Sequence, residues 1–192
     1  MMVIKKRFLA GEIACALGLA ASVLVAPAFA ALKPGTRAPD FSADAVVGGT
    51  RFAFALSDAL KKGPVVLYFF PKAFTTGCTA EAHDFAAAAS QFSAAGATLI
   101  GMSGDDLETL QRFSIQECSS SFPVAADPGL RIIRSYDAVM LRIPGIVGIS
   151  DRVSYVIGTD GRISYVYQGG DPEKHVQNTL AEAQRLSAMR PR

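Results

Sequence analysis

An unbroken apolar run over residues 65–70, ended by Pro71, limits the folds open to this chain more than any other part of the sequence. A strand that is apolar at every position is buried on both faces of a sheet, so helices must cover both sides. A second apolar run follows at residues 98–102, and the alanine-rich stretch between the two has helical spacing. We therefore expect an α/β protein built on strand, helix, strand units.

The remaining segments extend the same architecture. We expect two short strands over residues 41–54 joined across Gly48-Gly49, helices over 57–62, 78–95 and from Asp105 and Asp106 toward Glu117, a strand over 122–126, a hairpin over 152–157 and 162–167, and a final helix over 172–189 begun by Asp171. Parallel units followed by an antiparallel hairpin and a terminal helix predict a thioredoxin-like three-layer α/β sandwich, with a central mixed β-sheet flanked by helices.

The first 30 residues have the pattern of a secretory signal peptide. Lys5, Lys6 and Arg7 form a basic start, residues 8–26 are mostly apolar, and residues 28–30 are an A-x-A cleavage site. We therefore expect a signal peptide over residues 1–30, one domain over residues 31–192, and export, in a bacterium to the periplasm. An uncleaved anchor is the alternative, since about 18 apolar residues just span a bilayer.

Charge and cysteine content narrow the function further. Of the 19 basic and 17 acidic residues, three basic and one acidic lie in the signal segment, so the rest of the chain is balanced. This balance gives no reason to expect nucleic acid as a partner. Cys15 would leave with the signal, and Cys78 and Cys118 are too few for a disulfide scaffold. The two remaining thiols are better explained as reactive groups than as structural cysteines.

Cys78 follows the apolar strand and stands at the expected start of a helix. Backbone N–H groups and the helix dipole favour a negative sulfur at such a position. A free thiol, with a pKa of about 8.5, is mostly protonated at neutral pH, so a nucleophilic thiolate needs such neighbours. The residues alone thus mark Cys78 as a candidate nucleophile.

The residues around Cys78 resemble a known family. Pro71, Thr75 and Cys78 fit the PxxxTxxC signature of the AhpC/TSA-like peroxiredoxins, and YFFPKAFTTGCTAEA is similar to the bacterioferritin comigratory protein, or Q-type, subfamily. A second match, residues 151–157 followed by Asp160-Gly161, resembles the segment that carries the family's active-site arginine, here Arg152.

This resemblance implies a thiol-dependent peroxidase that reduces hydrogen peroxide and organic hydroperoxides without metal, haem or flavin. It makes Cys78 the peroxidatic cysteine, oxidised to sulfenic acid, with Arg152 stabilising the thiolate and Glu81 holding the guanidinium. Thr75 would hydrogen-bond the thiolate and the peroxide, and Pro71 would shield the sulfur from water. A thioredoxin-like or other thiol would supply electrons to a monomer or homodimer with no stable membrane association.

The chain departs from the subfamily where many members carry a resolving cysteine. That position, five residues after Cys78, holds His83, which we interpret as a solvated or capping histidine. Other peroxiredoxins of this kind place the resolving cysteine in the helix that ends here near Cys118. We therefore expect Cys118 to condense with oxidised Cys78, the alternative being resolution by an outside thiol.

Other classes of protein fit the sequence less well. An exported thiol oxidoreductase or a copper-delivery protein needs paired thiols such as CxxC, and no such pair exists. A zinc site would have to use Cys78, Cys118, His83 and His175, whose spacings match no common finger. A binding module without catalytic activity would not need to keep Pro71, Thr75 and Arg152 together with Cys78. The apolar segment over residues 139–149 fits a dimer contact, a lip for an apolar peroxide or ordinary packing.

Overall fold

The computed structural model describes residues 31–140 and 148–189. Its strands form one mixed sheet in the order β2-β1-β5-β4-β3-β6-β7. The strands are β1 (Ser42–Val47), β2 (Thr50–Ala55), β3 (Val65–Phe69), β4 (Thr98–Ser103), β5 (Val124–Ala126), β6 (Val153–Ile157) and β7 (Ile163–Gln168). The signal segment, Cys15 and most of the apolar connection after Met140 lie outside the described residues.

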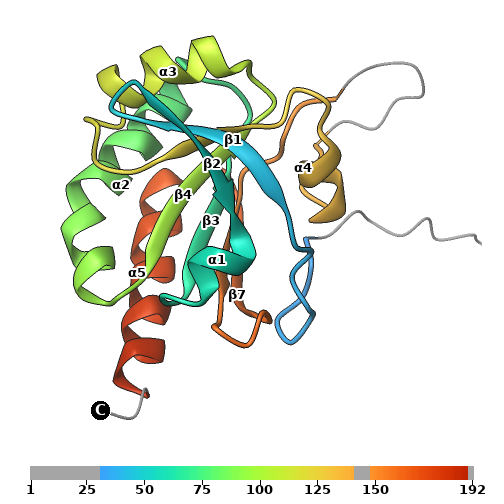
Figure 1. The fold of residues 1–192 in the computed structure, drawn as a ribbon, viewed down its shortest axis with the longest axis vertical. Coiled ribbons are helices and arrows are strands. Elements are labelled where there is room, and N and C mark those ends of the chain that lie inside the picture. Colours follow the sequence, from blue (N-terminus) through green and yellow to red (C-terminus); the bar gives the residue numbers. More distant parts are fainter. Residues whose placement is uncertain (1–30, 141–147, 190–192) are drawn as a thin grey trace, which may run out of the picture.

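Helices cover both faces of this sheet (Figure 1). The helices are α1 (Leu56–Leu60), α2 (Thr76–Ala94), α3 (Leu107–Gln116), α4 (Arg131–Ser135) and α5 (Pro172–Ala188). One apolar core joins α1 and α4 to the sheet, and a second joins α2, α3 and α5 to the opposite face. The expected three-layer sandwich is confirmed.

Strand β3 lies inside the sheet and all five of its residues are buried. It pairs in parallel with β4 and antiparallel with β6. The apolar run therefore forms the doubly covered strand that its composition predicts. Because β3 is followed at once by the loop to α2, this strand fixes where α2 begins.

The predicted hairpins are also present. Gly48 and Gly49 both have positive φ, as the tight β1–β2 turn requires. The strands β6 and β7 pair antiparallel across a turn in which Gly161 has positive φ. The antiparallel pairing of β6 with β3 places the residues that precede β6 beside the end of β3.

Helix α4 was not expected from the sequence. Its N-cap, Leu130, has a φ of 53°, and the Asp127 carboxylate accepts hydrogen bonds from the N–H groups of Arg131 and Ile133. The Asp127 side chain stabilises the start of this short helix. The helix has too few residues to show a periodic apolar pattern, so the sequence did not predict it.

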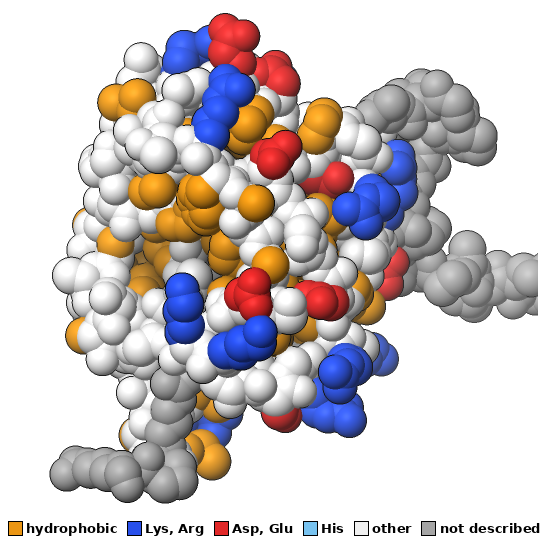
Figure 2. Space-filling model, viewed as in Figure 1, with side chains coloured by type: hydrophobic (Ala, Val, Ile, Leu, Met, Phe, Trp, Pro, Cys, Tyr) orange, Lys and Arg blue, Asp and Glu red, His pale blue; other side chains and the backbone are white. Residues whose placement is uncertain are grey.

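Charged side chains of both signs are interspersed over the face shown in Figure 2, and apolar side chains gather left of its centre. No helix among residues 31–140 and 148–189 is long and apolar enough to cross a bilayer.

Candidate active site

The loop between β3 and α2 is anchored by Asp105, which follows the neighbouring strand β4. The Asp105 carboxylate accepts a hydrogen bond of 2.7 Å from the Ala73 N–H and pairs with Lys72 Nζ at 3.0 Å. It also accepts a bond of 2.9 Å from the Ser103 hydroxyl. The carboxyl ends of adjacent parallel strands meet at one sheet edge, so β4 fixes the loop that leads to Cys78.

Sequence reasoning assigned Asp105 and Asp106 together to the start of a helix. In the structure only Asp106 caps α3, accepting from the Thr109 N–H at 2.7 Å. The anchoring role of Asp105 was missed. Its position directly after a buried parallel strand was the available signal.

Cys78 lies in the first turn of α2, whose N-cap is Thr75. Its side chain is buried, with 1% of its surface exposed. The N–H groups of a first turn have no partner within the helix, and the helix dipole is positive there. The thiol is therefore at the helix start, where the sequence placed it and where negative charge on sulfur is favoured.

Thr75 and Pro71 belong to the same loop. The Thr75 hydroxyl donates to the Lys72 carbonyl at 3.0 Å, so its only proton is committed to the loop and not to Cys78. Pro71 lines a small hollow together with Asp105, Leu130 and Ile149. The shielding of the sulfur by Pro71 stays a prediction.

Arg152 approaches Cys78 from the side of β3 that pairs with β6, whereas Asp105 follows β4 on the opposite side. Arg152 directly precedes β6, whose first residue Val153 is opposite Phe69 at the end of β3. The Arg152 Nη2 donates to Cys78 Sγ at 3.3 Å, and Nη1 donates to Glu81 Oε2. Arg152, predicted from a segment far along the chain, is thus in direct contact with both Cys78 and Glu81.

Glu81 is fully buried one turn after Cys78. Burial raises the pKa of Glu81, and the charge and hydrogen bond of Arg152 oppose this rise. Burial alone would lower the pKa of Arg152, but Glu81 and Cys78 together raise it, so the guanidinium stays charged. Glu81 Oε1 has no hydrogen-bond partner within the described part of the chain.

Two buried polar residues behind Glu81 were not assigned to this site from the sequence. The ring of His175 in α5 lies with Nδ1 2.7 Å from the Ser154 hydroxyl and 3.7 Å from Glu81 Oε1. The sequence offered His175 only as a zinc ligand. Its place in a helix gave no sign of the partners that packing against β6 provides.

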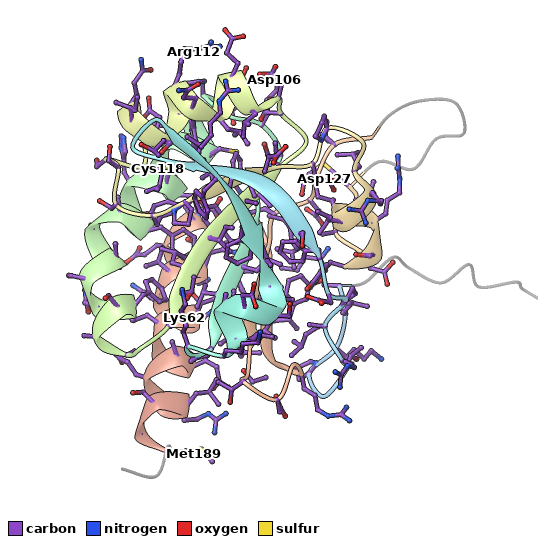
Figure 3. All side chains as sticks on the ribbon, viewed as in Figure 1. Lys62, Asp106, Arg112, Cys118, Asp127 and Met189 are labelled. Carbon is purple, nitrogen blue, oxygen red and sulfur yellow. The ribbon has the colours of Figure 1, made fainter. Side chains whose placement is uncertain are left out.

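Cys118 follows the C-terminal end of α3, beside α2 (Figure 3). It is a buried free thiol in the same apolar core as Cys78. Burial raises the pKa of Cys118 far above its usual range, and the charge of Glu117 adds to the rise. Ser119 and Ser120 continue the chain with positive φ. In this conformation Cys118 is a protonated, sealed thiol.

His83 is half-exposed and forms an ion-pair contact with Glu117, with Nε2 2.9 Å from Oε2. The residue at the vacant resolving position therefore connects α2 to the segment that carries Cys118. Within the part of the chain that the structure describes, no group of three or more His, Cys, Asp or Glu residues is placed to hold a metal ion.

Comparisons with known proteins agree with this geometry. Residues 34–166 match the model of the AhpC/TSA family. The chloroplastic peroxiredoxin Q of Populus jackii is 32% identical over 163 residues, which cover 82% of this chain and 71% of the relative.

Two solved structures have a similar fold. Peroxidoxin BcpB from Mycobacterium tuberculosis has a TM-score of 0.73 and 29% identity, covering 83% of this chain and 99% of that one. Peroxiredoxin Q from Xanthomonas campestris has a TM-score of 0.65 and 25% identity, covering 75% and 90%. The chain belongs to the AhpC/TSA family, and its resemblance within that family is to the Q-type peroxiredoxins, the bacterioferritin comigratory proteins.

Proposed function

We propose that this chain is a thiol-dependent peroxidase whose peroxidatic cysteine is Cys78. The observation that carries the proposal is the 3.3 Å hydrogen bond from Arg152 Nη2 to Cys78 Sγ, with Arg152 held in turn by the buried Glu81. A thiol at a helix N-terminus beside a fixed cation is the arrangement that favours a thiolate. A similar structure, the bacterioferritin comigratory protein of Xanthomonas campestris, is described by its alkyl peroxide reduction activity, which supports the same reaction class here.

The reaction breaks one O–O bond and forms one S–O bond. The Cys78 thiolate attacks the terminal oxygen of a hydroperoxide along the O–O axis, and the sulfur is oxidised to sulfenic acid. The bonding pair leaves with the second oxygen, which takes a proton and departs as an alcohol, or as water when the substrate is hydrogen peroxide. Charge that develops on the two oxygens is stabilised by fixed donors, here Arg152 and the first-turn N–H groups of α2.

Thr75 and Pro71 complete the proposed site. Since the Thr75 proton goes to the Lys72 carbonyl, its oxygen lone pairs are the groups that it offers to the O–H of a bound hydroperoxide. Pro71 lacks an N–H group and so offers water no donor beside the sulfur. These roles require a bound substrate.

Cys118 is the proposed resolving thiol. Its sulfur attacks the Cys78 sulfenic acid, a disulfide forms and water leaves, and an external thiol such as a thioredoxin-like protein then reduces the disulfide. Both thiols are buried in one core and neither is in a disulfide, so the proposed step includes a local opening that brings their Cα atoms within about 7 Å in disulfide geometry. The oligomeric state is proposed as monomer or homodimer.

Peroxide consumption by the reduced chain with a dithiol donor tests the proposal. Wild type should turn over hydrogen peroxide and an organic hydroperoxide, and Cys78→Ser should not. Equal consumption by the two proteins would contradict the assignment of Cys78. Cys118→Ser is the matched control, because it removes the other buried thiol and should still reduce one equivalent of peroxide.

Peptide mapping without reductant tests the role of Cys118. After one equivalent of peroxide, a Cys78–Cys118 crosslink should appear, and Cys118→Ser should instead accumulate sulfenic acid that dimedone traps. Absence of the crosslink in wild type, within or between chains, would leave resolution to an outside thiol.

Export is proposed on the pattern of residues 1–30. Expression of the full chain in a Gram-negative host should give a periplasmic product that begins at Ala31. A product that keeps residues 1–30 in the membrane fraction would support the anchor instead, and one that keeps them in the cytoplasm would contradict export.

A further inference from the structure

His175 is a fully buried titratable residue that the proposed reaction does not use. Its Nε2 lies 2.9 Å from the Gly169 carbonyl and its Nδ1 lies 2.7 Å from the Ser154 hydroxyl. Because a carbonyl only accepts, Nε2 must carry the proton, and Nδ1 then accepts from the hydroxyl of Ser154. These two partners fix the neutral tautomer and the orientation of the ring.

Both partners of His175 flank the backbone of Arg152. Ser154 is two residues further along the chain in β6, and Gly169 donates its N–H to the Arg152 carbonyl at 3.3 Å. The imidazole thus connects α5 to β6, which begins directly after Arg152. It also connects α5 to Gly169, whose N–H group bonds the Arg152 carbonyl. The ring of His175 therefore contacts both segments that flank the Arg152 main chain.

A third contact leads to the Arg152 side chain. The His175 Nδ1 lies 3.7 Å from Glu81 Oε1, too far for a hydrogen bond, and the other oxygen of Glu81 accepts from Arg152. Oε1 has no hydrogen-bond partner among residues 31–140 and 148–189. A buried carboxylate oxygen without a donor is held only by what packs around it, so the ring of His175 limits where Glu81 lies.

We propose that His175 is a positioning residue of the peroxidase reaction, which holds Arg152 beside Cys78 through Ser154, Gly169 and Glu81. The proposal deepens the proposed function and rests on it. His175 touches neither Cys78 nor a substrate bound there, and acts through the guanidinium that does.

The charges around His175 are consistent with a neutral ring. The pKa of His175 is lowered to about 4, first by burial and then by the Arg152 charge, while the Gly169 carbonyl and the charges of Asp171 and Asp151 oppose the shift. Glu81 faces the ring from α2, and the Tyr167 ring meets it edge-on at 4.6 Å between centroids. At neutral pH the imidazole therefore adds no positive charge that would compete with Arg152 for Glu81.

The test measures how the rate of Cys78 alkylation depends on pH, and does not measure peroxide turnover. His175→Phe keeps a ring and removes both hydrogen bonds, while His175→Gln keeps a donor near the place of Nε2. Alkylation of Cys78 by iodoacetamide, followed by mass spectrometry of its peptide in the reduced full chain, gives a pH profile. In His175→Phe the midpoint should rise by about one pH unit, a tenfold lower rate on the acid side. His175→Gln should return part of the shift.

Val176→Ala is the matched control, since it opens a cavity at the next residue of α5, in the same core, and removes no hydrogen bond or ion pair. An unchanged midpoint in folded His175→Phe, or an equal shift in Val176→Ala, would overturn the proposal. If His175→Phe fails to fold, Ser154→Ala takes its place, with a smaller shift in the same direction expected and no shift overturning the proposal. Wild-type peroxide turnover is measured separately, so loss of the proposed function is distinguished from loss of the positioning role.

Discussion

One absent methyl group at Gly77 leaves room for the guanidinium beside the thiol. A Cβ at this position would lie 3.2 Å from Arg152 Nη2, closer than ordinary van der Waals contact. Arg152 is held by both Cys78 and Glu81, so it cannot withdraw without losing a contact. The glycine therefore serves the site, because a helix would otherwise favour alanine here.

Gly77→Ala should separate stability from activity. Alanine in a helix is favoured over glycine by up to about 1 kcal/mol, so the free energy of unfolding should stay level or rise. The rate of peroxide reduction should fall by about tenfold, as expected for the loss of roughly one charge-assisted hydrogen bond. Urea unfolding and stopped-flow peroxide kinetics give the two values. Gly129→Ala, where a Cβ meets open space, is the control. An unchanged rate in Gly77→Ala would show that Arg152 needs no such room.

His175 should also make stability depend on pH. Its pKa is about 4 in the folded chain and about 6.5 when unfolded, so the unfolded state binds more protons between these values. The His175 contribution alone therefore lowers the free energy of unfolding by about 2 kcal/mol between pH 7 and pH 5, while the buried Glu81, whose pKa burial raises, acts in the opposite direction. Glu81 is present in both proteins, so the comparison isolates the imidazole: in urea unfolding, wild type should lose about 2 kcal/mol more than His175→Gln between pH 7 and pH 5. Equal losses in the two proteins would contradict a neutral buried imidazole.

At the scale of the elements, the sequence predicted what local patterns control. The strand β3 and the helix α2 are present because apolar runs and helical spacing determine them within a few residues. The short helix α4 escaped prediction because the Asp127 side chain and a left-handed Leu130 create it. The roles of Asp105 as loop anchor and Asp106 as helix cap also depend on side-chain contacts, and only the position of Asp105 directly after a buried strand separates the two in the sequence.

The residues of the site also differ in how far local sequence patterns predict them. Periodicity placed Cys78 at a helix start, but Arg152, 74 residues later, came only from the family resemblance. Contact between the two depends on the antiparallel pairing of β3 with β6. His175 was not foreseen, because its partners come from three other elements or turns and no local pattern joins them.

The ion pair between α2 and the end of α3 gives a prediction about Cys118. His83 contacts Glu117 at 2.9 Å, next to the buried thiol. His83→Ala should let this segment open more often, and Cys118 should react with N-ethylmaleimide up to about fivefold faster, the range expected for an exposed pair. Peptide-resolved mass spectrometry measures the rate.

Lys61→Ala is the control for that experiment, because it removes an exposed ion pair with Asp58 on α1, which packs on the opposite face of the sheet from both thiols. Its Cys118 labelling should match wild type. Unchanged labelling in His83→Ala would mean that opening of this segment is limited by burial of the cysteine and not by the ion pair.

At the scale of the whole molecule, the sheet separates two apolar cores. Cys78 and Cys118 both belong to the core beneath α2, α3 and α5, while α1 and α4 pack on the opposite face. Local opening around the two thiols therefore exposes one core. The other core lies on the far side of the sheet, whose inner strand β3 is fully buried, and can stay intact.

Hydrogen exchange across the oxidation cycle should reveal this asymmetry. After one equivalent of peroxide, amides in the first turn of α2 and in residues 117–122 should exchange faster than in the reduced chain, since joining the two sulfurs disrupts both segments. Amides of β3 and β6, whose ladder joins the cores, should keep their protection. Cys118→Ser treated in the same way is the control, and its residues 117–122 should stay protected. Faster exchange throughout β3 and α1 in the oxidised wild type would mean that the fold opens as one unit, and that resolution is not a local event.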